Sequence, residues 1–180
     1  MQNPLLRDEL DRQHPERLAL RPKDVGGVIA GFDAVDAMWA PTLERAHALP
    51  DGAVHQRVDG EWSFVETLRH LLFATDAWIT RVVLGMPGYH ELSVPPDDVP
   101  SERGAELEPV LAARRDQHAR IRDRLAHLTD DELDRFVTAP DAHWPPGAHR
   151  PIDCFHIVLR EEWWHHQFAV RDLAVIERGQ

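Results

Sequence analysis

Apolar side chains recur every three or four residues along four long segments of the chain, a period that is typical of amphipathic helices. The alternation of apolar and polar residues that strands would show is scarce. Four such helices with two long connections predict an all-α protein that folds as a four-helix bundle. We expect a single domain over residues 1–180, with 1–23 as an N-terminal extension. In chain order, the predicted helices cover residues 24–49, 63–85, 106–128 and 152–178.

Capping residues mark where these helices begin and end. Asp24 has the short polar side chain that is preferred at a helix N-cap. Ser63 followed by Glu66 forms the sequence pattern of a capping box, and Gly85 suits the position just after a helix C-terminus. The proline-rich connection over residues 85–104 is long for a compact domain, and such connections are often functional. We therefore expect it to flank a site.

The last helix has a buried seam that is interrupted by two polar residues. Glu162 and His166 are consecutive on this seam, and side chains four residues apart stack on one helix face. The neighbouring pair, Glu161 and His165, lies on a row of mixed polarity beside the seam. The pattern therefore predicts that Glu162 and His166 point inward and that Glu161 and His165 lie at the flank. The seam consists of Ile152, Phe155, Leu159, Glu162, His166, Ala169, Leu173 and Ile176.

A carboxylate and an imidazole inside a bundle need a compensating partner, because an unpaired buried charge costs several kcal/mol. One interpretation is a mutual hydrogen bond between Glu162 and His166 that fixes the packing. The other is a bound cation, which needs a third ligand from another helix. His70 is the best candidate, because the small residues Ala74 and Ala77 on its face leave space for a ligand, although a surface histidine would fit the same pattern. The predicted metal site is His70, Glu162 and His166.

Composition narrows the classes of function. Twenty lysines and arginines against 31 acidic residues give a net charge of −11, which argues against binding to nucleic acid or to an anionic membrane. No segment approaches the roughly 20 apolar residues that span a bilayer, and the first residues do not resemble a signal peptide. The one cysteine, Cys154, cannot form an internal disulfide. A cytoplasmic protein is therefore expected.

Two stretches, EWSFVETLRHLLFATDAWITRVVLG and VLREEWWHHQFAVRDLAVIE, together with the VPP loop, resemble the DinB-like family of metal-binding proteins. This family includes mycothiol- and bacillithiol-dependent enzymes, and the resemblance covers about residues 25–178. It implies a bundle with up-down-down-up topology and one divalent metal near one end. The ligands would be a histidine of the second helix, matched by His70, and a His-x-x-x-His pair of the fourth, matched by Glu162 and His166. The glutamate departs from the usual pattern, but the set still suits zinc, nickel, manganese or iron.

Three functions agree with these observations. The first, implied by the resemblance, is a metal-dependent enzyme acting on a small molecule, either a hydrolase or an S-transferase whose thiol is an external cofactor such as mycothiol rather than Cys154. The second is a non-catalytic metal- or ligand-binding protein. The third is a metal-free helical domain that acts through a partner surface. A homodimer is also expected, because Trp78, Trp163 and Trp164 offer more aromatic area than one core absorbs.

Overall fold

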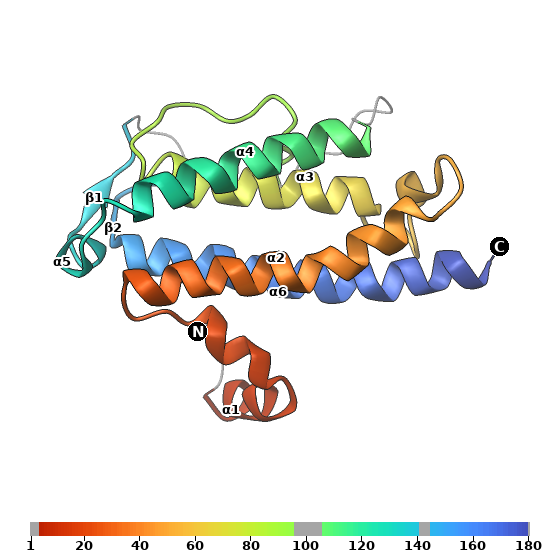
Figure 1. Cartoon of the computed structure of the whole chain (residues 1–180), viewed down its shortest axis with the longest axis horizontal. Coiled ribbons are helices and arrows are strands. Elements are labelled where there is room, and N and C mark those ends of the chain that lie inside the picture. Colours follow the sequence, from red (N-terminus) through yellow and green to blue (C-terminus); the bar gives the residue numbers. More distant parts are fainter. Residues whose placement is uncertain (1–3, 96–105, 141–144, 180) are drawn as a thin grey trace.

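The protein folds as a four-helix bundle in which α2 and α6 run in one direction and α3 and α4 run in the other (Figure 1). The computed structural model describes residues 4–95, 106–140 and 145–179, with side chains from residue 9 onward. This arrangement confirms the all-α class and the up-down-down-up topology. The four long helices are α2 (Val25–His47), α3 (Phe64–Thr75), α4 (Leu107–Leu125) and α6 (Pro151–Arg178).

Shorter elements connect and extend the bundle. Two strands of two residues each pair antiparallel, with Val137 opposite His149, and the sequence did not predict them. None of the helices among the described residues is long and apolar enough to cross a membrane. The short elements are α1 (Pro4–Gln13), η1 (Pro15–Leu20), η2 (Ala53–His55), the π-helical turn η3 (Asp76–Thr80), α5 (Asp130–Leu133), β1 (Val137–Thr138) and β2 (Ala148–His149).

The predicted caps are present. The Asp24 side chain accepts a hydrogen bond from the amide of Gly27 at 2.7 Å. Ser63 and Glu66 exchange the two hydrogen bonds of a capping box at the start of α3. The regular α-helical hydrogen bonding of α3 ends earlier than predicted, and the chain continues through the wider π-helical turn η3. The chain then turns at Gly85, which has a φ of +66°. The capping box fixes the residue at which α3 begins, and therefore which of its side chains lie level with those of α6.

The predicted seam of α6 is buried along its whole length. Its six apolar residues lie in the core, and Glu162 and His166 are 0% and 9% exposed. The prediction that both polar side chains point inward is therefore confirmed. Gly31 of α2 lies against this seam, where an added Cβ would approach the Leu159 side chain to 2.9 Å. The missing side chain allows α2 and α6 to pack closely.

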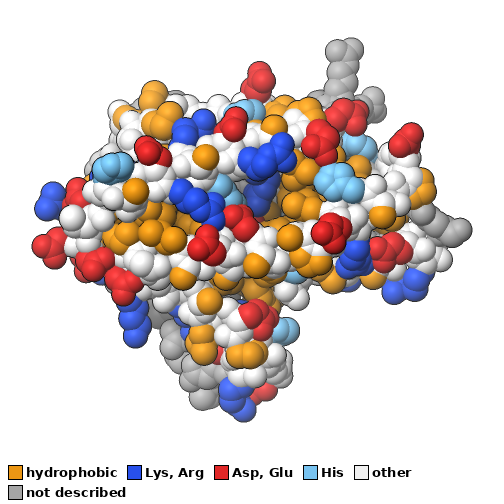
Figure 2. Space-filling model, in the orientation of Figure 1, with side chains coloured by type: hydrophobic (Ala, Val, Ile, Leu, Met, Phe, Trp, Pro, Cys, Tyr) orange, Lys and Arg blue, Asp and Glu red, His pale blue; other side chains and the backbone are white. Residues whose placement is uncertain are grey.

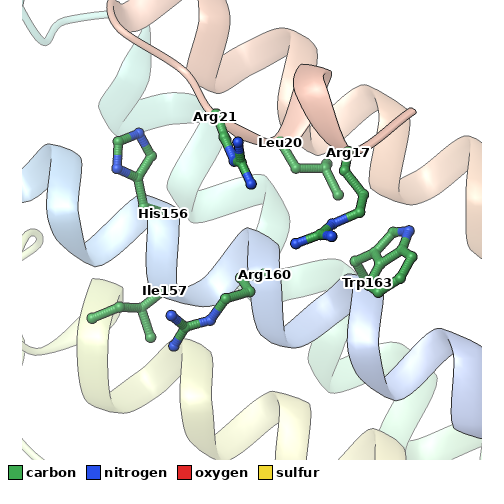
Figure 3. A pocket seen from close by; sticks show the side chains of 7 residues that line it. All are labelled: Arg17, Leu20, Arg21, His156, Ile157, Arg160 and Trp163. Carbon is green, nitrogen blue, oxygen red and sulfur yellow. The ribbon is translucent and has the colours of Figure 1, made fainter. Parts of the chain in front are cut away.

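The N-terminal extension packs beneath α2 and α6 (Figure 1). The guanidinium group of the buried Arg17 lies 4.7 Å from the centre of the Trp163 ring, and the Trp163 indole donates to Glu16. The chain's own N-terminal segment thus covers Trp163, one of the three tryptophans on which the expectation of a homodimer rests. A hollow of about 310 Å³ remains at this junction (Figure 3). It is lined by Arg17, Leu20, Arg21, His156, Ile157, Arg160 and Trp163.

Candidate metal centre

The structure brings together His70 of α3 with Glu161 and His165 of α6. One potential ligand atom from each residue lies within 4.8 Å of the other two. His70 is buried, while Glu161 and His165 are partly exposed. Two imidazoles and a carboxylate at the junction of two helices form a donor set that is suited to a divalent metal.

Glu162 and His166, which the sequence assigned to the site, have other partners. Arg114 of α4 and the Trp39 indole of α2 donate to the Glu162 carboxylate, and Nε2 of His166 lies 2.9 Å from the Thr42 hydroxyl. The group that gathers around His70 therefore contains the adjacent pair in place of the predicted one. The reason is that α6 packs against both α2 and α3, and a residue one position earlier is rotated by about 100° around the helix axis.

The orientation of His165 is fixed by its own helix. Its Nδ1 lies 2.9 Å from the backbone carbonyl oxygen of Glu161. A carbonyl only accepts hydrogen bonds, so Nδ1 carries a proton, and Nε2 is the nitrogen that offers a lone pair when the ring binds a metal. Histidines that bind a metal through one ring nitrogen commonly donate the N–H of the other nitrogen to a backbone carbonyl.

His70 has the character of a metal ligand. Burial and, to a smaller extent, the neighbouring His165 lower its pKa to about 4, although a hydrogen bond to the backbone of Val94 acts in the opposite direction. The ring is therefore neutral at pH 7, which is the form that binds metals. Its Nδ1 is buried and has no hydrogen-bond partner among the described residues. Such an orphaned buried atom calls for an explanation, and a bound ion provides one.

Aromatic rings pack around the two histidines of the group. The Trp62 ring centre lies 4.6 Å from that of His70 and 6.4 Å from that of His165. Phe73 lies 6.2 Å from His70, and Phe168 lies 5.9 Å from His165. An apolar shell of this kind restricts water at a metal site and strengthens electrostatic interactions there. Trp62 was missed by sequence reasoning, because it precedes the first residue of α3 and belongs to no periodic pattern.

The proline-rich connection flanks the group, as expected from its length. The Arg69 side chain donates to the carbonyl of Leu92 at 2.9 Å, and the ring of His70 bonds to the backbone of Val94. The carboxylate of Asp76 accepts from the amide of His90 and from the hydroxyl of Ser93. These bonds hold the described part of the connection against α3 beside His70.

The distances suit a metal after a small inward movement. Ligand atoms about 2.1 Å from a tetrahedral ion stand roughly 3.4 Å apart, compared with the limit of 4.8 Å observed here. Three protein ligands leave at least one open coordination position, which is the arrangement of catalytic rather than structural sites.

Cys154 lies outside this group. The thiol is fully buried, and burial together with the nearby Asp153 raises its pKa to about 12. We expect the folded protein to resist a thiol-specific reagent at pH 8, because the thiolate is the reactive form. Labelling should become rapid after unfolding in guanidinium chloride. Mass spectrometry measures the labelling. Fast labelling of the native protein would show instead that Cys154 is accessible and ionised.

Comparison with known proteins identifies the family. A family model described as the DinB superfamily matches residues 34–169, which is more than half of the chain and includes His70, Glu161 and His165. No curated protein and no solved structure matches. Members of the family bind divalent metals and include metal-dependent enzymes. With its helical bundle and its His, Glu and His group, the chain belongs to the DinB superfamily.

Proposed function

We propose that the protein binds one divalent metal through His70, Glu161 and His165 and uses it in catalysis on a small molecule. The observation that carries this proposal is the buried Nδ1 of His70, without a partner among the described residues, beside a second imidazole, His165, whose Nδ1 is bonded to a backbone carbonyl. A metal held there would receive two imidazoles and one carboxylate, a set that suits zinc, nickel, manganese or iron.

A bound divalent cation would supply Lewis acidity at its open position for a water molecule or a small thiol. The chain's own residues provide orientation and aromatic contacts around the two histidines. The Glu161 carbonyl holds the proton of His165 on Nδ1, and the rings of Trp62 and Phe168 cover the histidine from two sides. Glu161 contributes one negative charge, which keeps the centre more electropositive than a site with several carboxylates.

We further propose that the reaction transfers a low-molecular-weight thiol, such as mycothiol, to an electrophile. The buried Cys154 thiol, with its raised pKa, cannot serve as the nucleophile, so the thiol must come from a cofactor. A metal site with an open position can hold a thiolate for attack on an electrophile.

The test is a conjugation assay on metal-loaded protein with mycothiol, bacillithiol and a reactive halide. Turnover is expected with one of the thiols, and it should disappear in His165→Ala and after chelation. His127→Ala is a matched control, because Nδ1 of His127 makes the same bond to the carbonyl four residues earlier but lies on an exposed helix end. Stoichiometric metal without turnover of any thiol or hydrolytic substrate would support the non-catalytic alternative.

A further inference from the structure

We propose that the groove between α2 and α4 is a second site, which binds a small molecule with one carboxylate and a hydrophobic body. The groove has a volume of about 390 Å³. Figure 2 shows a hollow between these helices, with hydrophobic side chains inside it and lysine or arginine side chains at its edge. The lining residues of α2 are Asp36, Trp39, Ala40 and Leu43, that of α3 is Leu68, and those of α4 are Leu111, Arg114, Arg115, His118, Ala119 and Arg122.

The groove exists because its two walls are held by different helices. α2 packs mainly against α6, and α4 packs mainly against α3, so contact between α2 and α4 is slight. The exposed residues Ala40 and Ala119 stand on opposite walls. Because these side chains are small, the groove stays open towards solvent.

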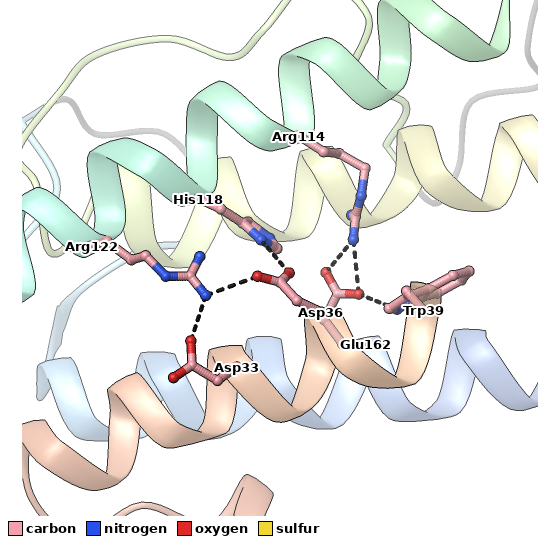
Figure 4. Close-up of polar contacts among 7 residues, drawn as sticks. All are labelled: Asp33, Asp36, Trp39, Arg114, His118, Arg122 and Glu162. Carbon is pink, nitrogen blue, oxygen red and sulfur yellow. Dashed lines mark hydrogen bonds and ion pairs between the residues drawn. The ribbon is translucent and has the colours of Figure 1, made fainter. Parts of the chain in front are cut away.

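The α4 wall carries a row of basic side chains. Arg114, His118 and Arg122 are spaced four residues apart, so they lie on one face of the helix. Figure 4 shows all three reaching towards α2. Arg114 and His118 belong to the polar sequence ARRDQHAR, which spans residues 113–120, yet both are buried. A protein with a net charge of −11 thus buries an arginine and a histidine in this groove.

Arg114 uses only part of its hydrogen-bonding capacity. Its Nη2 donates to both carboxylate oxygens of Glu162 at 2.9 and 3.0 Å, and its guanidinium carbon lies 5.9 Å from the centre of the Trp39 ring. Its Nη1 is buried and finds no acceptor in the described part of the chain. A buried guanidinium donor without an acceptor is costly, and a ligand oxygen would relieve that cost.

His118 is also half used. Its Nδ1 lies 3.1 Å from Asp36, while its buried Nε2 has no partner among residues 4–95, 106–140 and 145–179. Partial burial raises the pKa of Asp36, but hydrogen bonds and charges from His118 and Arg122 outweigh this effect and leave the pKa below its ordinary value. Arg122 also binds Asp33 at 2.8 Å. The acidic groups of the groove are therefore already paired, and unused capacity remains on Arg114 and His118.

Charge and polarity together define the ligand class. The three arginines that line the groove are matched in number by the carboxylates of Asp33, Asp36 and Glu162. Because Nη1 of Arg114 is a buried guanidinium donor without an acceptor among the described residues, a ligand that brings a carboxylate oxygen is favoured over a cation. The Glu162 carboxylate, which is bonded to the same guanidinium group, opposes a second negative charge on the ligand. Leu43, Leu68 and Leu111 offer an apolar surface for its body, and the volume is at the small end of ligand pockets. A small amphipathic monocarboxylate fits these requirements.

The experiment is a calorimetric titration of the full-length protein with octanoate. We expect saturable 1:1 binding, and roughly 10- to 100-fold weaker binding of the neutral octanamide, because hydrogen bonds to charged groups contribute this much. Ala40→Trp should fill the groove and remove binding. Ala37→Trp is the matched control, since Ala37 is exposed on the same helix but does not line the groove.

Further outcomes separate this site from the metal centre. His165→Ala should bind octanoate with unchanged affinity, whereas binding that depends on His165 would overturn the proposal. Equal binding by Ala40→Trp and Ala37→Trp, equal affinity for octanamide, or equal affinity for inorganic phosphate would overturn it too. If Ala40→Trp fails to fold by circular dichroism, the comparison of octanoate with octanamide on the wild-type protein still decides.

Discussion

Replacing His165 with alanine is expected to weaken divalent-metal binding by more than about 100-fold, because losing even an outer hydrogen bond of a metal site costs 10- to 100-fold. The neighbouring His166→Ala should retain the metal, since His166 faces Thr42 of α2, whereas the candidate ligands meet between α6 and α3. Zinc and nickel titrations, with metal content measured by mass spectrometry, provide the measurement.

This pair of variants distinguishes two ligand sets that differ by one residue of register. Loss of metal in His166→Ala, with retention in His165→Ala, would restore the set His70, Glu162 and His166 that the seam pattern predicts. Loss in both variants would need a check of folding before it could be assigned to either residue.

Replacing Glu162 is expected to lower the stability of the fold. Replacing the adjacent Glu161 is expected to weaken metal binding and to leave the stability nearly unchanged. Glu162→Ala removes the only carboxylate that the described residues place on Arg114, and breaking such a buried pair costs about 3–5 kcal/mol in the free energy of unfolding. Glu161→Ala should cost less than about 1 kcal/mol, because Glu161 is partly exposed and its contact with Arg160 is 3.5 Å long. Urea unfolding of the metal-free proteins at pH 7 measures both values.

A double variant tests the cause of the loss. Glu162→Met combined with Arg114→Met removes both charges, so it should recover much of the stability that Glu162→Ala loses. Equal destabilisation by Glu161→Ala and Glu162→Ala would show that the Glu162–Arg114 pair has no special role.

The helices were predictable because their signals are local. The caps at Asp24 and Ser63 and the three-four spacing of apolar residues act within a few turns of chain. The same spacing correctly predicted that Glu162 and His166 are buried. Burial alone did not reveal their partners, because Glu162 and His166 bond to residues of α4 and α2, whereas the partly exposed row beside the seam faces His70.

The polar partners depend on contacts between distant segments. Arg114 and Glu162 are 48 residues apart, and His118 and Asp36 are 82 residues apart. Within α4 alone, Arg114 and His118 lie on a polar face that is typical of solvated residues. They are buried because other helices supply carboxylates as their partners. Strands β1 and β2 were missed because two residues are too few to show alternation.

The most direct test is anomalous diffraction across the absorption edge of the bound metal, with a crystal of protein purified without a polyhistidine tag. We predict one strong peak about 2.0–2.2 Å from ligand atoms of His70, Glu161 and His165. A peak beside His166 and Glu162, or no peak in crystals grown with excess zinc and nickel, would contradict the proposed centre.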